Sequence, residues 1–253
     1  MKKVLNRVPE VTGSFWIIKV LATTVGETAA DYLSVTLNLG LGITSYIMSG
    51  LLLIALWNQF RLKRYVPVSY WLVVVFTSIT GTLITDRLVD ELGVSLMTTT
   101  IVFSVVLLVV FALWYLKEKT LAMHSINTAK RELFYWVAIL FTFALGTATG
   151  DLLAEALKLG YAQSALIFGV LIAIVASGYY YFRINAVLAF WLAYILTRPL
   201  GASMGDLLSQ PAKNGGFGLG TVETSMLFLS IIVSLVIYLS LKQKQPAPID
   251  QQD

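Results

Sequence analysis

The chain has 253 residues, of which 57% are apolar and only 13% are charged. This composition excludes an ordinary soluble domain and is typical of a polytopic membrane protein. With no cysteine and a single histidine, His124, the sequence offers neither a disulfide framework nor the usual ligands of a zinc or copper site. The net charge of +4 does not indicate nucleic-acid binding, because the basic residues lie mainly at the ends of apolar segments.

The apolar stretches predict an all-α fold with eight transmembrane helices of about 20 residues each. Basic residues concentrate in alternate connections, so the positive-inside rule places both termini in the cytoplasm. The polar tail 243–253 is expected to be disordered. In chain order, the helices are expected near residues 14–37, 41–60, 69–89, 94–116, 134–157, 161–182, 187–208 and 223–241.

Every second predicted helix carries the same motif, in which a Trp is followed ten residues later by Gly and five residues after that by Asp. Since each repeat contains two helices, the four motif helices run in one direction across the bilayer. We therefore expect a single transmembrane domain, residues 1–253, of four parallel-repeat helical hairpins in a pseudo-fourfold or two-by-two arrangement. The repeats span about 14–60, 69–116, 134–182 and 187–241, and their motif residues are Trp16, Gly26 and Asp31; Trp71, Gly81 and Asp86; Trp136, Gly146 and Asp151; and Trp191, Gly201 and Asp206.

Helix geometry places the three motif residues at different depths. At 1.5 Å per residue the Asp lies roughly 22 Å beyond the Trp. A Trp at the cytoplasmic interface then puts the Asp in the outer part of the bilayer. We expect the four tryptophans to form an aromatic belt at that interface. We also expect the tryptophans and the four glycines to be packing positions of the repeat, where the glycines let neighbouring helices approach closely.

The motif aspartates are the strongest functional candidates, because a carboxylate near the hydrocarbon is costly and four equivalent ones predict a shared site. Clustered carboxylates suit hard cations such as Mn²⁺, Mg²⁺, Ca²⁺ or Na⁺, or a proton relay. In the alternative reading, the aspartates are solvated at the headgroups and fix the helix turns. The candidate binding or relay residues are Asp31, Asp86, Asp151 and Asp206, which are also the candidate metal ligands, and the second acids Glu27, Asp90 and Glu155, each four residues from a motif Asp.

Two basic residues within the predicted helices are not repeated. Lys19 follows Trp16 by three residues, and we expect its side chain to extend to the cytoplasmic interface. Arg198 lies deeper, directly before Pro199, which should kink the helix. Arg198 is a candidate counter-ion for one of the acids, and both basic residues are candidates for a gate.

The fourfold Trp, Gly and Asp pattern resembles a bacterial family often labelled "membrane-anchored protein". That family is defined by four tandem repeats of unknown function, each with two membrane helices and a characteristic tryptophan. The resemblance covers about residues 14–241. It implies an eight-helix protein of the bacterial inner membrane and supplies no established reaction.

These patterns favour a transporter or exporter of a hard cation, Mn²⁺ or similar, coupled to protons through the four repeat aspartates. The alternative is a membrane scaffold, assembly factor or sensor that transports nothing. An enzyme is not expected, because no Ser-His pair is present and the Gly-x-Gly-Asp pattern of intramembrane aspartyl proteases is missing. We expect no cofactor, and as partners the lipid bilayer, a small cation and protons; homo-oligomerisation is left open.

Overall fold

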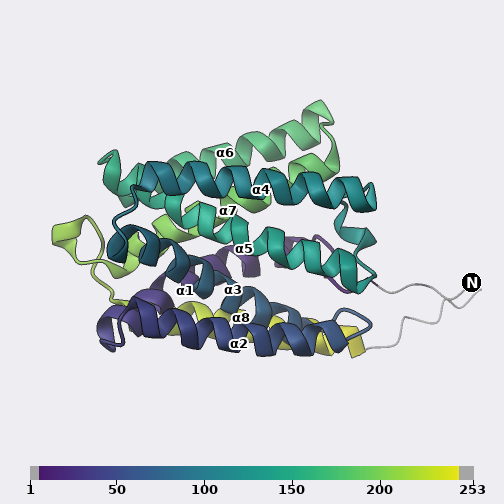
Figure 1. The fold of residues 1–253 in the computed structure, drawn as a ribbon, viewed down its shortest axis with the longest axis horizontal. Coiled ribbons are helices and arrows are strands. Elements are labelled where there is room, and N and C mark those ends of the chain that lie inside the picture. The colour runs from purple at the N-terminus through teal and green to yellow at the C-terminus, as the bar shows by residue number, and fades with distance from the viewer. Residues whose placement is uncertain (1–5, 245–253) are drawn as a thin grey trace, which may run out of the picture.

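The computed structural model describes residues 6–244, and over that range it contains helices and no β-strand (Figure 1). The expected all-α class is confirmed, and the helix bounds lie within six residues of those predicted. The long helices are α1 (Gly13–Asp31), α2 (Leu41–Arg61), α3 (Pro67–Asp86), α4 (Leu96–Glu118), α5 (Ala129–Asp151), α6 (Tyr161–Phe182), α7 (Ala186–Ser209) and α8 (Thr221–Lys244).

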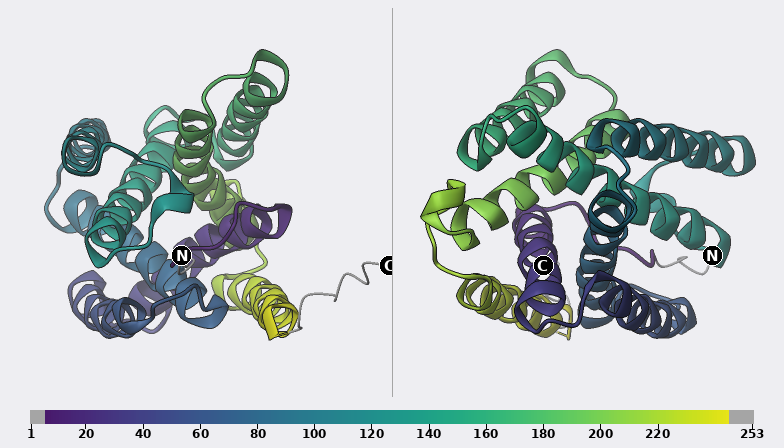
Figure 2. Two further views of the ribbon diagram at one scale, coloured as in Figure 1. Left: turned by 90° about the vertical axis from the view of Figure 1, so that its right-hand side faces the viewer. Right: turned by 60° about the vertical axis from the view of Figure 1, so that its left-hand side comes forward.

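The four motif helices form a closed inner ring. Helix α1 packs against α3 and α7, and α5 packs against the same two helices from the opposite side. The remaining helices lie outside this ring, as the two views of Figure 2 show. Helix α2 packs on α3, α4 on α5, α6 on α7, and α8 on α1. Each of the first three outer helices therefore packs mainly on the inner helix of the next repeat, so the packing does not confirm the predicted parallel hairpins.

Seven of the eight long helices in the described range are long and apolar enough to cross a membrane. Their outward faces carry exposed apolar side chains such as Ile54, Leu108 and Leu166, as expected of surfaces that contact lipid. The exception is α1, whose 19 residues include Lys19, Glu27 and Asp31. The chain is thus a multi-pass membrane protein. Length and composition support seven of the eight expected membrane spans.

The prediction of a disordered C-terminal tail is wrong for its first two residues. Gln243 and Lys244 belong to the last turn of α8 and are helical. The rest of the predicted tail, 245–253, lies outside the described residues.

One end of the inner ring is closed by an aromatic collar, made of the four motif tryptophans and the aromatic residue that precedes each of them. In every repeat this preceding ring contacts the Trp of the next repeat, which closes the circle. The prediction of an interfacial aromatic belt is wrong for Trp71, Trp136 and Trp191, which are only 2%, 3% and 4% exposed. The four contacts join Phe15 to Trp71 (5.7 Å between ring centroids), Tyr70 to Trp136 (5.4 Å), Tyr135 to Trp191 (6.2 Å) and Phe190 to Trp16 (5.7 Å).

The motif glycines lie at the contacts between neighbouring inner helices. A β-carbon placed on any of them would lie within 2.8 Å of the β-carbon of a residue on the next inner helix, closer than packed atoms allow. This agrees with the packing role predicted for the glycines. The pairs are Gly26 with Ser78, Gly81 with Phe143, Gly146 with Arg198, and Gly201 with Thr23.

Candidate functional site

Three of the four motif aspartates are the last residue of an α-helix and are followed directly by one turn of π-helix. These turns are Tyr32–Thr36, Arg87–Glu91 and Leu152–Ala156. Single π turns occur frequently at functional sites. In the fourth repeat, α7 continues past Asp206 without a π turn. There the backbone N–H of Gln210 donates to the backbone carbonyl of Asp206 at 2.9 Å, an ordinary α-helical hydrogen bond.

The aspartates of all four repeats line one cavity of about 160 Å³ at the end of the ring opposite the aromatic collar. We call it the acid cavity. The second acids line it too, so the structure brings together every acidic residue that the sequence analysis selected. Its seven acids are Glu27, Asp31, Asp86, Asp90, Asp151, Glu155 and Asp206, and Gln210 lines it at the position where repeats 2 and 3 have Asp90 and Glu155.

Exposure increases across the acid cavity from its base to its mouth. Glu27 and Asp206 are buried at 5% and 6% exposure, the other three motif aspartates are half-buried, and Asp90 and Glu155 are exposed. The cavity thus runs from the outer surface of the bundle to the ring interior. Two hydrogen bonds order its wall, from Gln210 Nε2 to Asp31 Oδ2 (3.2 Å) and from the Tyr161 hydroxyl to Glu155 Oε1 (3.0 Å).

The acids surround a space and do not form a close ligand set. Within residues 6–244, no group of three or more Asp, Glu, His or Cys side chains is arranged to hold a metal ion. The predicted ligation of a metal by the four aspartates therefore has no support from the side-chain positions as they stand.

Arg198 lies directly beneath the acid cavity and joins all four inner helices. From α7 its guanidinium donates to Glu27 Oε2 at 2.9 Å, to the Thr23 carbonyl at 3.1 Å and to Thr147 Oγ1 at 2.8 Å. It also donates to the hydroxyl of Thr82. The predicted counter-ion contact is present, and the acid that Arg198 pairs with is Glu27 of α1, not a motif aspartate.

Lys19 is fully buried in the ring, so the expectation that it reaches the cytoplasmic interface is wrong. Its ammonium lies 4.1 Å from the ring centroid of Phe143 and 4.2 Å from that of Tyr194. The aromatic collar closes the end of the ring toward which the side chain would have to extend. The ammonium is held instead by cation–π contacts with two ring faces.

The arrangement of the repeats agrees with a known family. A family model described as Repeat of Unknown Function (DUF347) matches residues 14–65, 69–120, 134–185 and 189–245. The chain belongs to this family. No curated protein and no solved structure matches the chain.

Comparing the four repeats of this chain with one another shows which site residues the sequence analysis missed. Three side chains that accept hydrogen bonds from Arg198 lie eleven residues after a motif Trp. They are the Glu27 carboxylate in repeat 1 and the hydroxyls of Thr82 and Thr147 in repeats 2 and 3. The shared register of these three residues was the available signal. Phe143 and Tyr194 gave no such signal, because one aromatic ring among apolar residues is ordinary in a membrane helix.

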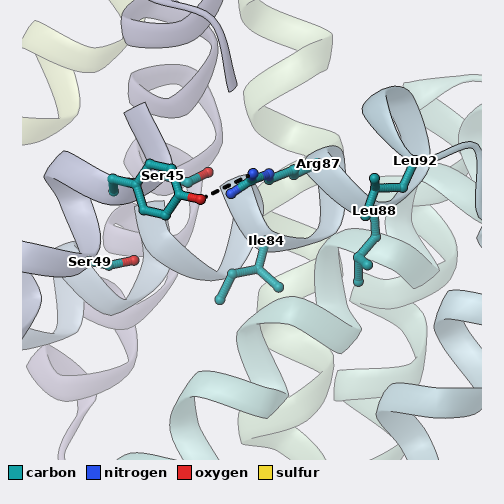
Figure 3. A pocket seen from close by; sticks show the side chains of 7 residues that line it. Ser45, Ser49, Ile84, Arg87, Leu88 and Leu92 are labelled. Carbon is teal, nitrogen blue, oxygen red and sulfur yellow. Dashed lines mark hydrogen bonds between the residues drawn. The ribbon is translucent and has the colours of Figure 1, made fainter. Parts of the chain in front are cut away.

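A second pocket, of about 330 Å³, lies between α2 and the end of α3 (Figure 3), and it shares no lining residue with the acid cavity. Arg87 is its only charged lining residue, and it donates to the Tyr46 hydroxyl at 3.4 Å and to Glu91 Oε2 at 3.1 Å. The other repeats have no basic residue at the position of Arg87. This pocket therefore does not share the fourfold pattern of the acid cavity.

Proposed function

We propose that this protein is a membrane transporter or exporter that takes a hard cation into the acid cavity. The observation that carries the proposal is the convergence of seven acidic side chains from all four repeats on one cavity of about 160 Å³. Intramembrane carboxylates are costly, and their usual use is an ion pathway or a proton relay.

The charge of the cavity supports exchange between cations and protons. Several carboxylates around one small volume repel each other when ionised, so bound protons or cations must neutralise part of their charge. A cation that enters would displace protons, and protons that return would release it. Carboxylate and amide oxygens suit Mn²⁺, Mg²⁺, Ca²⁺ or Na⁺, and the open spacing of the acids suits an ion that keeps some of its water.

The proposed topology includes α1 as the eighth span. Its charges do not face lipid: Lys19 and Glu27 are buried in the ring and Asp31 lines the acid cavity. A helix whose polar groups face the bundle interior can lie in a membrane at acceptable cost. With both termini in the cytoplasm of a bacterial inner membrane, as the distribution of basic residues favours, the acid cavity would open to the outside. The parallel direction of the four motif helices belongs to the same proposal and is supported by the aromatic collar, which gathers all four Trp ends.

The test is cation flux into proteoliposomes that hold the purified protein, measured for each of the four ions with a pH gradient in either direction. Asp86→Asn should reduce flux at least about tenfold, the loss that follows when roughly 1.4 kcal/mol of ion binding disappears. The matched control is Glu10→Gln, which neutralises an exposed acid outside the long helices and should keep wild-type flux. If wild-type protein moves none of the ions under either gradient, the transport proposal fails.

A further inference from the structure

We infer that the pocket between α2 and the end of α3 binds the headgroup of a phospholipid that carries both a phosphate and a primary ammonium, as phosphatidylethanolamine does. We call it the headgroup pocket. It lies on the outside of the bundle, where its lining residues Tyr46 and Leu92 are 69% and 65% exposed. The inference goes beyond the transport function proposed above and needs only that the chain is a membrane protein.

The headgroup pocket lies at the depth of the lipid headgroups. Helix α2 has 21 residues, so at 1.5 Å per residue it is about 32 Å long, close to the thickness of the hydrocarbon core. Its first three turns therefore lie near one boundary of the bilayer, and they carry Ser45, Tyr46 and Ser49 of the pocket. Tyrosine is favoured at this boundary, because its ring is apolar and its hydroxyl is polar.

The lining of the headgroup pocket matches the two parts of a phospholipid. Its polar atoms are the guanidinium of Arg87 and the hydroxyls of α2, on the side where a headgroup would lie (Figure 3). Its apolar lining comes from Ile84, Leu88 and Leu92, which can contact the beginning of an acyl chain. A water-soluble anion would gain nothing from this apolar side, so the lining favours a lipid.

Arg87 and Glu91 form an ion pair at the pocket that keeps free hydrogen-bonding capacity. Arg87 Nε donates to Glu91 Oε2 at 3.1 Å, and the backbone N–H of Gly42 donates to Glu91 Oε1 at 3.1 Å. Both charged side chains stay accessible, at 35% and 40% exposure. The bonds to Glu91 and to the Tyr46 hydroxyl use two of the five N–H groups of the guanidinium. Donors therefore remain for a phosphate, and the carboxylate can accept further hydrogen bonds.

The net charge of this ion pair favours one class of headgroup. One arginine and one glutamate sum to zero, so an anionic headgroup would bring a negative charge close to Glu91 without a second cation to offset it. A headgroup with both charges fits the pair, since Arg87 can donate to its phosphate and its ammonium can donate to Glu91. A choline headgroup fits less well, because its quaternary ammonium has no N–H group.

Arg87 is specific to the second repeat, where the other repeats have Tyr32, Leu152 and Leu207. The chain therefore has this site once and not four times. The π turn that begins with Arg87 also carries Asp90, which lines the acid cavity. A lipid bound to Arg87 would thus hold in place a turn that forms part of the wall of the acid cavity.

The site is tested by native mass spectrometry of delipidated protein in detergent, titrated with phosphatidylethanolamine, phosphatidylcholine or phosphatidylglycerol. We expect wild type to bind phosphatidylethanolamine at least about tenfold more tightly than Arg87→Gln does, because the variant loses a charge-assisted hydrogen bond. Arg183→Gln is the control and should bind as wild type does, since Arg183 is exposed at the end of α6, outside the pocket. Equal binding by wild type and R87Q overturns the site.

Glu91→Gln tests the match between the ion pair and the headgroup. The variant leaves Arg87 without its carboxylate, so the preference for phosphatidylethanolamine over phosphatidylglycerol should fall at least about tenfold. An unchanged preference in E91Q overturns the assignment of the headgroup. So does a wild type that binds either of the other two lipids as tightly as phosphatidylethanolamine, a comparison that needs no variant.

Soluble glycerophosphoethanolamine distinguishes a lipid site from a site for the free headgroup. It has the same phosphate and ammonium but no acyl chains, so it should displace bound lipid only at concentrations at least about tenfold above that of the lipid. Displacement at equal concentration overturns the lipid assignment, because the apolar lining would then contribute nothing to binding.

Discussion

Gly146 lies directly against Arg198, the side chain that joins the four inner helices. A β-carbon on Gly146 would lie 2.5 Å from the β-carbon of Arg198 and 3.0 Å from Cδ of Pro199. The absence of a side chain at this position therefore sets how closely α5 and α7 approach, and with it the height at which the guanidinium meets Glu27.

Gly146→Ala should lower the free energy of unfolding by about 1–3 kcal/mol, because the added methyl group would have to push α7 outward. Gly169→Ala is the matched control. Gly169 lies in α6, where nothing lies within 4 Å of an added β-carbon. Thermal unfolding in detergent compares the two variants, and an unchanged melting temperature for G146A would contradict the packing described for the motif glycines.

The aromatic collar should contribute to stability through its buried rings. Trp71→Leu removes a ring that is 2% exposed and contacts Phe15 and Tyr70, and we expect it to cost about 3 kcal/mol. Trp57→Leu is the control, since Trp57 is 66% exposed on the outer helix α2. Unfolding in denaturant at fixed detergent concentration measures both. Equal losses in the two variants would show that the collar packs no better than an outer surface.

Neutralising Glu27 should destabilise the ring more than neutralising a peripheral acid. Glu27→Gln leaves Arg198 buried with its charge unpaired, which costs about 3–5 kcal/mol. Glu91→Gln breaks the exposed pair with Arg87 and should leave unfolding almost unchanged. The double variant Glu27→Gln, Arg198→Met should recover part of the loss, because the unpaired charge is then gone. No recovery would mean that Arg198 stabilises the ring mainly through its hydroxyl and carbonyl partners.

The sequence predicts much of the acid cavity, namely which acids line it. Constant spacing from Trp to Asp put the four aspartates at the same end of the ring, and the separation of four residues put Glu27, Asp90 and Glu155 on the same helical faces. Repeated positions in a closed ring then converge on one axis. What the pattern predicted is where the acids gather; their role in ion binding stays a prediction.

The surroundings of Lys19 and Arg198 could not be derived in the same way. Lys19 lies three residues after Trp16, and its distance from the helix end suggested an interfacial side chain. The collar that closes this end depends on contacts between repeats, which a single helix does not reveal. The partner of Arg198 likewise depends on the relative heights of α7 and α1, and the π turns after the aspartates left no signal that hydrophobic periodicity could detect.

Repeat 4 has Gln210 at the position where repeats 2 and 3 have an acid, and a substitution can introduce the acid there. Gln210→Glu would add an eighth acid beside Asp31, whose Oδ2 lies 3.2 Å from Gln210 Nε2. We expect the variant to bind a divalent cation several-fold more tightly at neutral pH, because the cavity becomes more negative. Gln243→Glu, near Tyr65 at the collar end of the bundle, is the control and should leave affinity unchanged. Isothermal titration with Mn²⁺ measures both, and weaker or equal binding in Q210E would contradict a cavity whose affinity follows its charge.

The most direct test of the acid cavity is equilibrium binding of Mn²⁺ to purified wild-type protein and to a variant with Asp31, Asp86, Asp151 and Asp206 all changed to Asn. Glu10→Gln serves as the control, and thermal unfolding confirms that each protein is folded. We predict saturable binding to wild type and to E10Q with release of protons, and affinity at least about tenfold lower in the folded fourfold variant. Equal binding by wild type and the folded fourfold variant would contradict the account, because the four aspartates would then form no cation site.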